Sequence, residues 1–142
     1  MNLHLSDMER QELKFSTQKE NIHMVEKLID KVSEEYKIEE TNYGNMLIAV
    51  TEAVYNAMFH GNKSNPQKSV FVAFEKNNTG ITYTIKDEGD GFDPDSLPDP
   101  TAPENLEKEF GRGVFLMRNL SDHIEFEDNG RSVKLSFNLK KD

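Results

Sequence analysis

The hydrophobic patterns of this chain occur in an order that limits its possible folds, because helical periodicity comes first and strand alternation follows. Apolar residues with helical spacing predict a first helix reaching residue 36, introduced by a capping box at Thr17 and Glu20. A second helix is expected over residues 41–61, where loop chemistry begins. Residues 70–74 then form a continuously apolar run, typical of a buried strand, and residues 81–85 alternate as its return strand.

The remaining patterns complete an α+β arrangement. Residues 12–16 alternate and predict an opening strand, and residues 113–120 predict a third helix after a long loop-like stretch. Residues 123–126 and 133–139 predict a closing hairpin. We therefore expect a two-layer α/β sandwich, with helices on one face of a mixed, mostly antiparallel sheet. The absence of repeats and linkers predicts a single domain over residues 1–142.

Composition argues against several classes of function. The chain has no cysteine, which excludes disulfides, thiolate metal sites and cysteine nucleophiles. Its net charge is −9 and it has no run of Lys or Arg, so we expect no direct contact with nucleic acid. No stretch approaches the length of a membrane span, and the N-terminus lacks a signal-peptide pattern. These features predict a cytoplasmic protein with no membrane contact.

A polar stripe runs along the second predicted helix. Glu52, Asn56 and His60 recur every four residues and therefore share one helical face. An amide oxygen suits a hard cation such as Mg²⁺, and a carboxylate one turn away can orient or deprotonate a nucleophile. A solvated polar face is the alternative explanation of the stripe taken alone.

The first glycine-rich stretch, Asp87-Glu88-Gly89-Asp90-Gly91-Phe92, directly follows a predicted strand. Gly89 and Gly91 would allow positive φ and the close approach of a flat ligand. Asp87 would offer an acceptor to an exocyclic amino group such as that of adenine. An ordinary turn explains the stretch equally well.

The second glycine-rich stretch, Gly111-Arg112-Gly113-Val114-Phe115-Leu116, is expected to open the third helix. Unpaired amides at a helix start bind phosphate, and Lys108 and Arg112 add positive charge there. The stretch has neither the P-loop pattern nor the strand that precedes a dinucleotide fingerprint. A helix start with close packing is the alternative.

Taken together, three motifs resemble the N, G1 and G2 boxes of the GHKL ATPase superfamily, and the resemblance covers about residues 10–140. The motifs are Glu52-x-x-x-Asn56-x-x-x-His60-Gly61, Asp87-x-Gly89-x-Gly91-Phe92 and Gly111-x-Gly113-x-x-Leu116. Details at residues 56–61 and 111–122 most resemble the stand-alone anti-sigma-factor serine/threonine-protein kinases, which act in bacterial partner switching. The resemblance implies a histidine-kinase-like ATPase domain with the Bergerat ATP-binding fold.

The resemblance also implies roles for individual residues. Asn56 would coordinate the Mg²⁺ that bridges the phosphates of ATP, and Glu52 would be the general base. Asp87 would bind the adenine amino group, and Gly91 would let the base approach. Residues 93–109 would form the ATP lid, and His60 would be structural at the helix end, near the phosphates. The other implied nucleotide contacts are Gly89, Phe92, Lys108, Gly111, Arg112, Gly113, Val114 and Phe115.

The implied function is an ATP-dependent serine/threonine kinase that phosphorylates an anti-sigma-factor antagonist domain. It would also bind a sigma factor or another regulator, with phosphorylation deciding which partner is held, and it could work as a homodimer. A catalytically weak, nucleotide-gated protein-binding module is the first alternative. An ATP-binding fragment of a histidine kinase or gyrase-type machine is the second.

Overall fold

Alternating side chains produce one antiparallel sheet in the computed structural model, which describes residues 9–91 and 109–139. The strand order is β1-β2-β3-β5-β4 within that part of the chain, and each neighbouring pair is antiparallel. The strands are β1 (Arg10–Ser16), β2 (Ser69–Lys76), β3 (Gly80–Lys86), β4 (His123–Glu127) and β5 (Ser132–Asn138). The predicted strands are all present, and the sheet belongs to the predicted, mostly antiparallel class.

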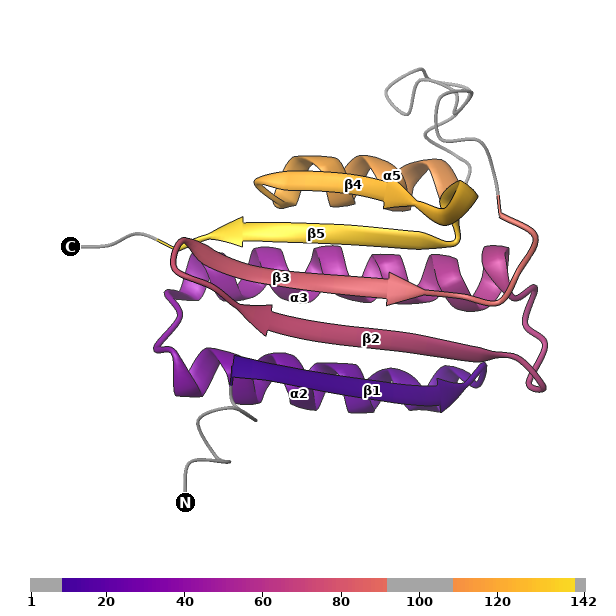
Figure 1. Ribbon diagram of the computed structural model, residues 1–142, viewed down its shortest axis with the longest axis horizontal. Helices are drawn as coiled ribbons and strands as arrows, with labels where there is room; N and C mark the ends of the chain where they lie inside the picture. Colours follow the sequence, from indigo (N-terminus) through magenta and orange to yellow (C-terminus); the bar gives the residue numbers. More distant parts are fainter. Residues whose placement is uncertain (1–8, 92–108, 140–142) are drawn as a thin grey trace.

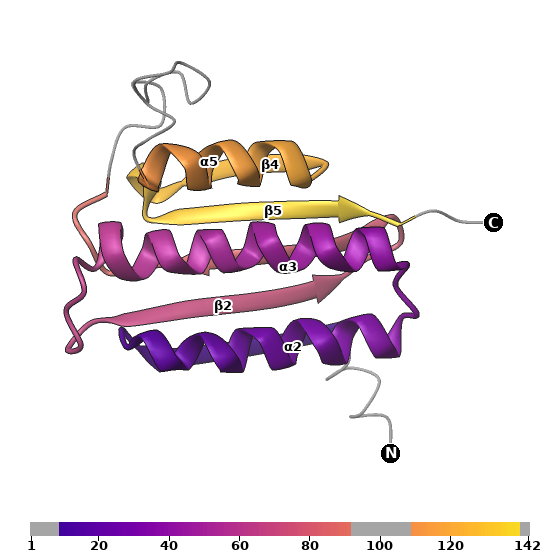
Figure 2. The same cartoon turned by 180° about the vertical axis from the view of Figure 1, so that it is seen from behind.

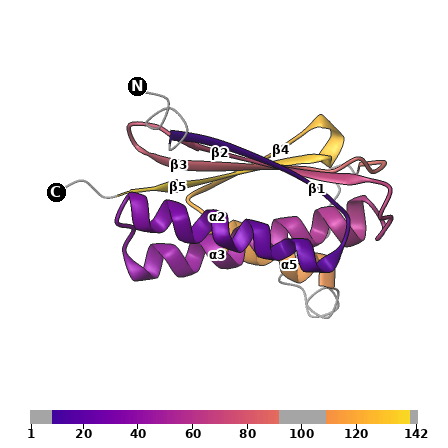
Figure 3. The ribbon, with the colours of Figure 1, turned by 90° about the horizontal axis from the view of Figure 1, so that it is seen from below.

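The helices lie together on one face of this sheet (Figures 2 and 3). They are α2 (Ile22–Glu35), α3 (Glu40–Tyr55) and α5 (Glu109–Leu120), with the short turns η1 (Lys19–Asn21), η2 (Asn56–Gly61) and η4 (Asp128–Gly130). Figure 1 shows the opposite face of the sheet without a helix over it. The predicted two-layer α+β sandwich is therefore confirmed. None of the described helices is both long enough and apolar enough to cross a lipid bilayer.

The core lies between the sheet and the helices. Val70, Val72 and Phe74 alternate along β2 and are almost completely buried against the helices. Phe71 and Ala73 point to the uncovered face and are only partly buried. The prediction of a buried strand therefore holds for one face of β2 only, because helices cover one side of the sheet.

The predicted capping box is absent from the start of α2. The Thr17 hydroxyl donates to the Lys68 carbonyl at 2.7 Å instead of accepting from a helix amide. The helix is entered through η1, and neither η1 nor α2 has a side-chain hydrogen bond from its N-cap residue. A distant backbone acceptor thus replaces the local contact that the sequence pattern predicts.

The second helix reaches Gly61 as predicted, because α3 continues directly into the π-helical turn η2. The Asn62 amide closes this turn by donating to the Ala57 carbonyl at 2.8 Å. Such turns often occur at functional sites. The third helix differs from the prediction, because α5 begins at Glu109 and not at Gly113.

Candidate functional site

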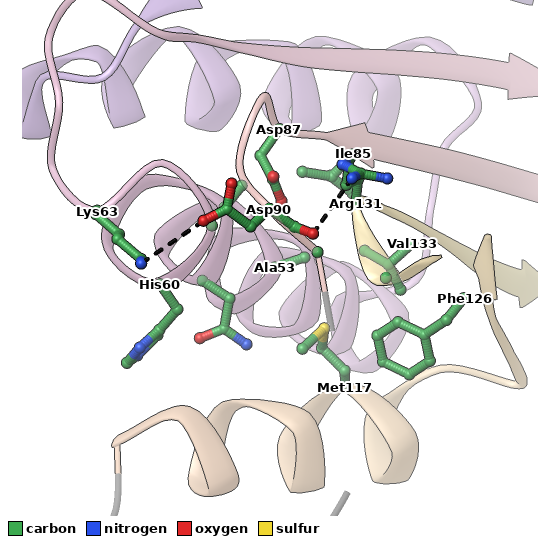
Figure 4. Close-up of a pocket in the computed structure, with 15 residues that line it drawn as sticks. Ala53, His60, Lys63, Ile85, Asp87, Asp90, Met117, Phe126, Arg131 and Val133 are labelled. Atoms are coloured by element: carbon green, nitrogen blue, oxygen red, sulfur yellow. Dashed lines mark hydrogen bonds and ion pairs between the residues drawn. The ribbon is translucent and has the colours of Figure 1, made fainter. Parts of the chain in front are cut away.

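Two hollows meet at the turn η2. The first, drawn in Figure 4, has a volume of about 370 Å³ and lies between η2, the loop after β3 and the start of β5. The second also has a volume of about 370 Å³ and lies on the helix layer, between α3, η2 and α5. Asn56 and His60 line both hollows, so this turn forms the wall between them.

The first hollow has apolar walls with polar groups among them. Its apolar side chains are Ala53, Ala57, Ile85, Met117, Phe126 and Val133. Its polar side chains are Asn56, His60, Lys63, Asp87, Asp90 and Arg131. The volume lies in the range of about 300–1,000 Å³ that small-molecule sites occupy. Apolar walls with a few polar groups suit a flat ring that has polar edges.

Asp87 supplies the carboxylate of the first hollow, directly after the end of β3. Its Oδ1 accepts a hydrogen bond from the Gly89 amide at 2.8 Å, which fixes the side chain against its own loop. Burial raises the pKa of the Asp87 carboxyl, while the Gly89 amide and the charge of Arg131 oppose that shift. A partly buried acceptor therefore lies where the sequence predicted one.

The two loop glycines have different structural roles. Gly91 has a φ of +82°, in the left-handed region, as predicted. Gly89 is not among the described glycines with positive φ. It is required instead by close packing, because a Cβ on Gly89 would overlap the carbonyl oxygen of Gly61. The end of the second helix and the Asp87 loop thus meet backbone to backbone.

Asn62 fastens this contact and was not among the predicted site residues. Its side chain is only 1% exposed. Its Nδ2 donates to Thr17 Oγ1 and to the Ser69 carbonyl, each at 2.9 Å, and its Oδ1 accepts from the Glu88 amide at 2.7 Å. The sequence signal that could have identified it is its place directly after His60 and Gly61.

The predicted polar stripe meets α5 at Gly113. A Cβ on Gly113 would lie 3.0 Å from Asn56 Nδ2 and 3.2 Å from Glu52 Oε2. Glycine at this position lets α5 approach the stripe closely. Asn56 Nδ2 is buried and has no hydrogen-bond partner among the described residues. The structure therefore brings together Glu52, Asn56 and the second glycine-rich stretch.

The earlier start of α5 changes what that stretch can offer. In a helix beginning at Glu109, the amides without an intrahelical partner include that of Gly111 but not those of Val114 and Phe115. The Val114 side chain is buried in the core. Arg112 is exposed and lines the second hollow together with Glu52. Phosphate contacts at Gly111 and Arg112 remain predictions, whereas residues 113–115 lack free helix-start amides.

Some predicted residues lie outside the described part of the chain. They are Phe92, Lys108 and residues 93–108 of the predicted lid. Conversely, Lys63, Asp90 and Arg131 line the first hollow although the sequence did not single them out. Lys63 Nζ lies 3.8 Å from Asp90 Oδ2, and both side chains are exposed. Turn sequences such as residues 128–131 carry no signal for such contacts.

Comparison with known proteins gives the family of this site. Residues 15–137 match the histidine kinase-like ATPase domain. The chain belongs to this family, which confirms the GHKL resemblance predicted from its motifs. It is 32% identical over 103 residues to the Serine-protein kinase RsbW of Staphylococcus aureus strains JH9, Newman and JH1. The match covers 67% of this chain and 65% of each relative, so the chain spans less than two thirds of these relatives.

Proposed function

We propose that this chain binds Mg–ATP and transfers the γ-phosphoryl group to a serine or threonine hydroxyl of an anti-sigma-factor antagonist domain. One observation carries the proposal: Asn56 and His60 line two adjacent hollows, one containing Asp87 and the other containing Glu52. A base-binding carboxylate and a catalytic carboxylate would then lie on opposite sides of one helical turn. Family membership and the relatives' name, serine-protein kinase, support the reaction type.

The first hollow would receive the adenine base. Asp87 would accept a hydrogen bond from the exocyclic amino group, while the apolar side chains contact the ring faces. The phosphates would extend past Asn56 and His60 toward the first turn of α5. There, the amide of Gly111 and the side chain of Arg112 would favour negative charge.

Asn56 would hold the metal ion. Its buried amide nitrogen has no hydrogen-bond partner among the described residues, so no bond from that nitrogen fixes the orientation of the carboxamide. Mg²⁺ accepts amide oxygen as a ligand and keeps several waters. When bound, the ion would neutralise phosphate charge, which is its usual contribution to phosphoryl transfer.

The acceptor hydroxyl would arrive through the second hollow. Glu52 lines this hollow and would accept the proton of the hydroxyl as it attacks. Tyr55 and Phe59, which are stacked with ring centroids 5.8 Å apart, offer an apolar wall to a segment of the partner. Lys19 and Arg112 add positive charge beside them.

The partners follow from the same proposal. Phosphorylation of the antagonist would decide whether the chain holds that protein or a sigma factor or other regulator. The family match over residues 15–137 supports a single ATP-binding domain in the chain. A homodimer and a cytoplasmic location remain predictions from the resemblance and the composition.

Radiolabel transfer from ATP to the co-purified partner tests the proposal. Glu52→Gln keeps size and hydrogen bonding but removes the base, so transfer should fall about 10²-fold or more. ATP affinity, measured by calorimetry, should stay within about threefold because the base acts on the hydroxyl. Glu40→Gln is the matched control, since Glu40 lies in the exposed first turn of the same helix.

Three outcomes would contradict the proposal at different levels. Absence of ATP binding by the wild type would contradict nucleotide binding itself. ATP binding without transfer to any co-purified partner would favour the nucleotide-gated binding module. Transfer by Glu52→Gln at the wild-type rate would refute the role of Glu52 while leaving the nucleotide site intact.

A further inference from the structure

We propose that Arg131 is a positioning residue for nucleobase recognition, because its hydrogen bonds hold the loop that contains Asp87 against the turn η4. The inference rests on the proposed nucleotide-binding function and concerns the same hollow. Arg131 lines that hollow beside Asp87 (Figure 4).

Both the side chain and the backbone of Arg131 hold the loop of residues 87–91. Its Nε donates to the Gly89 carbonyl at 2.9 Å, and its Nη2 donates to the Asp90 carbonyl at 3.2 Å. Its own carbonyl accepts from the Asp87 amide at 2.9 Å. One residue therefore fixes the loop at its start and at two positions farther along.

The same guanidinium also holds the opposite turn. Its Nη1 donates to the Asp128 carbonyl at 3.3 Å and lies 3.5 Å from Asp128 Oδ1. All three guanidinium nitrogens thus donate to protein oxygens, and in this proposal the group acts on the base through the loop that it holds.

The backbones that Arg131 joins are packed closely and have unusual conformations. Gly91 has a φ of +82°, and Asp128 and Asn129 have φ of +52° and +54°. A Cβ on Gly91 would overlap the Asn129 carbonyl oxygen. Sparsely populated conformations persist only where the surroundings hold them, and the Arg131 fork supplies that restraint.

The charge of Arg131 also has a measurable effect on the ionisation of Asp87. Arg131 and Lys68 favour the Asp87 carboxylate, Asp128 disfavours it, and Lys63 and Asp90 line the same hollow. Removing the Arg131 charge should raise the Asp87 pKa further. The carboxylate is the form that accepts a hydrogen bond from the amino group. When pH is lowered, a variant without the Arg131 charge should therefore lose ATP binding at a higher pH than the wild type.

Calorimetric titration with ATP and GTP over a pH series tests the proposal. Arg131→Met should weaken ATP binding about tenfold, reduce the preference for ATP over GTP and raise the pH below which ATP binding is lost. Arg131→Lys keeps the charge but loses the fork, so it should restore the wild-type pH dependence without restoring the base preference. Lys134→Met is the matched control, because it removes a positive charge from β5 on the uncovered face, 3.9 Å from Glu127.

The expected set of results supports a positioning role, and other results overturn it. Wild-type ATP preference in Arg131→Lys would mean that the fork is irrelevant, even if Arg131→Met does not fold. Equal losses of affinity for ATP and GTP in Arg131→Met, with an unchanged pH dependence of binding, would mean that Arg131 contributes only to the general stability of the fold. A wild type that binds neither nucleotide would overturn the proposed function as well.

Discussion

Gly113→Ala would test whether α5 must pack directly on the polar stripe of α3. The new Cβ would lie 3.0 and 3.1 Å from the carboxamide atoms of Asn56 and 3.2 Å from Glu52 Oε2, which is closer than the ordinary contact range of 3.4–4 Å. The side chains must therefore move by a few tenths of an ångström. A misplacement of about 1 Å can cost roughly 10²-fold in rate, so we expect transfer to fall about tenfold.

Stability should respond differently from activity. Alanine is favoured over glycine in a helix interior by about 0.8–1 kcal/mol, which offsets much of the crowding at residue 113. Gly44→Ala is the control, because no described atom outside its own helix backbone and chain neighbours lies within 4 Å of that Cβ. It should raise the melting temperature and leave transfer unchanged. If Gly113→Ala transfers phosphate at the wild-type rate, close packing there does not position the reacting groups.

Two further substitutions separate binding from stability. Asp87→Asn should weaken ATP about tenfold or more in calorimetry, since a charged hydrogen bond contributes about 1.5–3 kcal/mol. Because burial raises the folded-state pKa of Asp87 above 3.8, the contribution of Asp87 to wild-type stability should fall as pH rises from 3.8 through the raised value. Melting curves of Asp87→Asn should lack that fall; an identical pH dependence would contradict the burial argument. Asn62→Ala removes one buried and two partly buried hydrogen bonds and should lower the free energy of unfolding by roughly 2–4 kcal/mol in urea. A loss below about 0.5 kcal/mol would show that Asn62 does not fasten the loop.

The fold could be predicted from the sequence because its elements follow local periodicity. The apolar spacing of α2 and the alternation of β3 each identify one element and its buried side. The start of α2 could not be predicted in this way, because the Thr17 hydroxyl bonds to the carbonyl of Lys68, which is distant in sequence. A local pattern gives no information about a partner that the fold supplies.

In the candidate site, too, only the residues with a local sequence signal could be predicted. Glu52 and Asn56 could be placed together because both lie on one helix, and Asp87 because it follows a strand. The Arg131 contact with Gly89 spans 42 residues and depends on the pairing of β3 with β5. The packing of Gly89 on Gly61 likewise depends on how the helix end meets the sheet. Such contacts follow only from the assembled fold.

Amide chemical shifts would locate the nucleotide on the molecule. Titration of the ¹⁵N-labelled protein with ATP and Mg²⁺ should give its largest shifts at residues 56–61, 87–91 and 130–131, which surround the first hollow. The uncovered sheet face provides an internal comparison, because Lys14, Phe71 and Ala73 line a separate hollow there. Saturable shifts at η2 and the Asp87 loop are the predicted result. Shifts concentrated on the uncovered sheet face, or none at millimolar ATP, would contradict the assignment of the site.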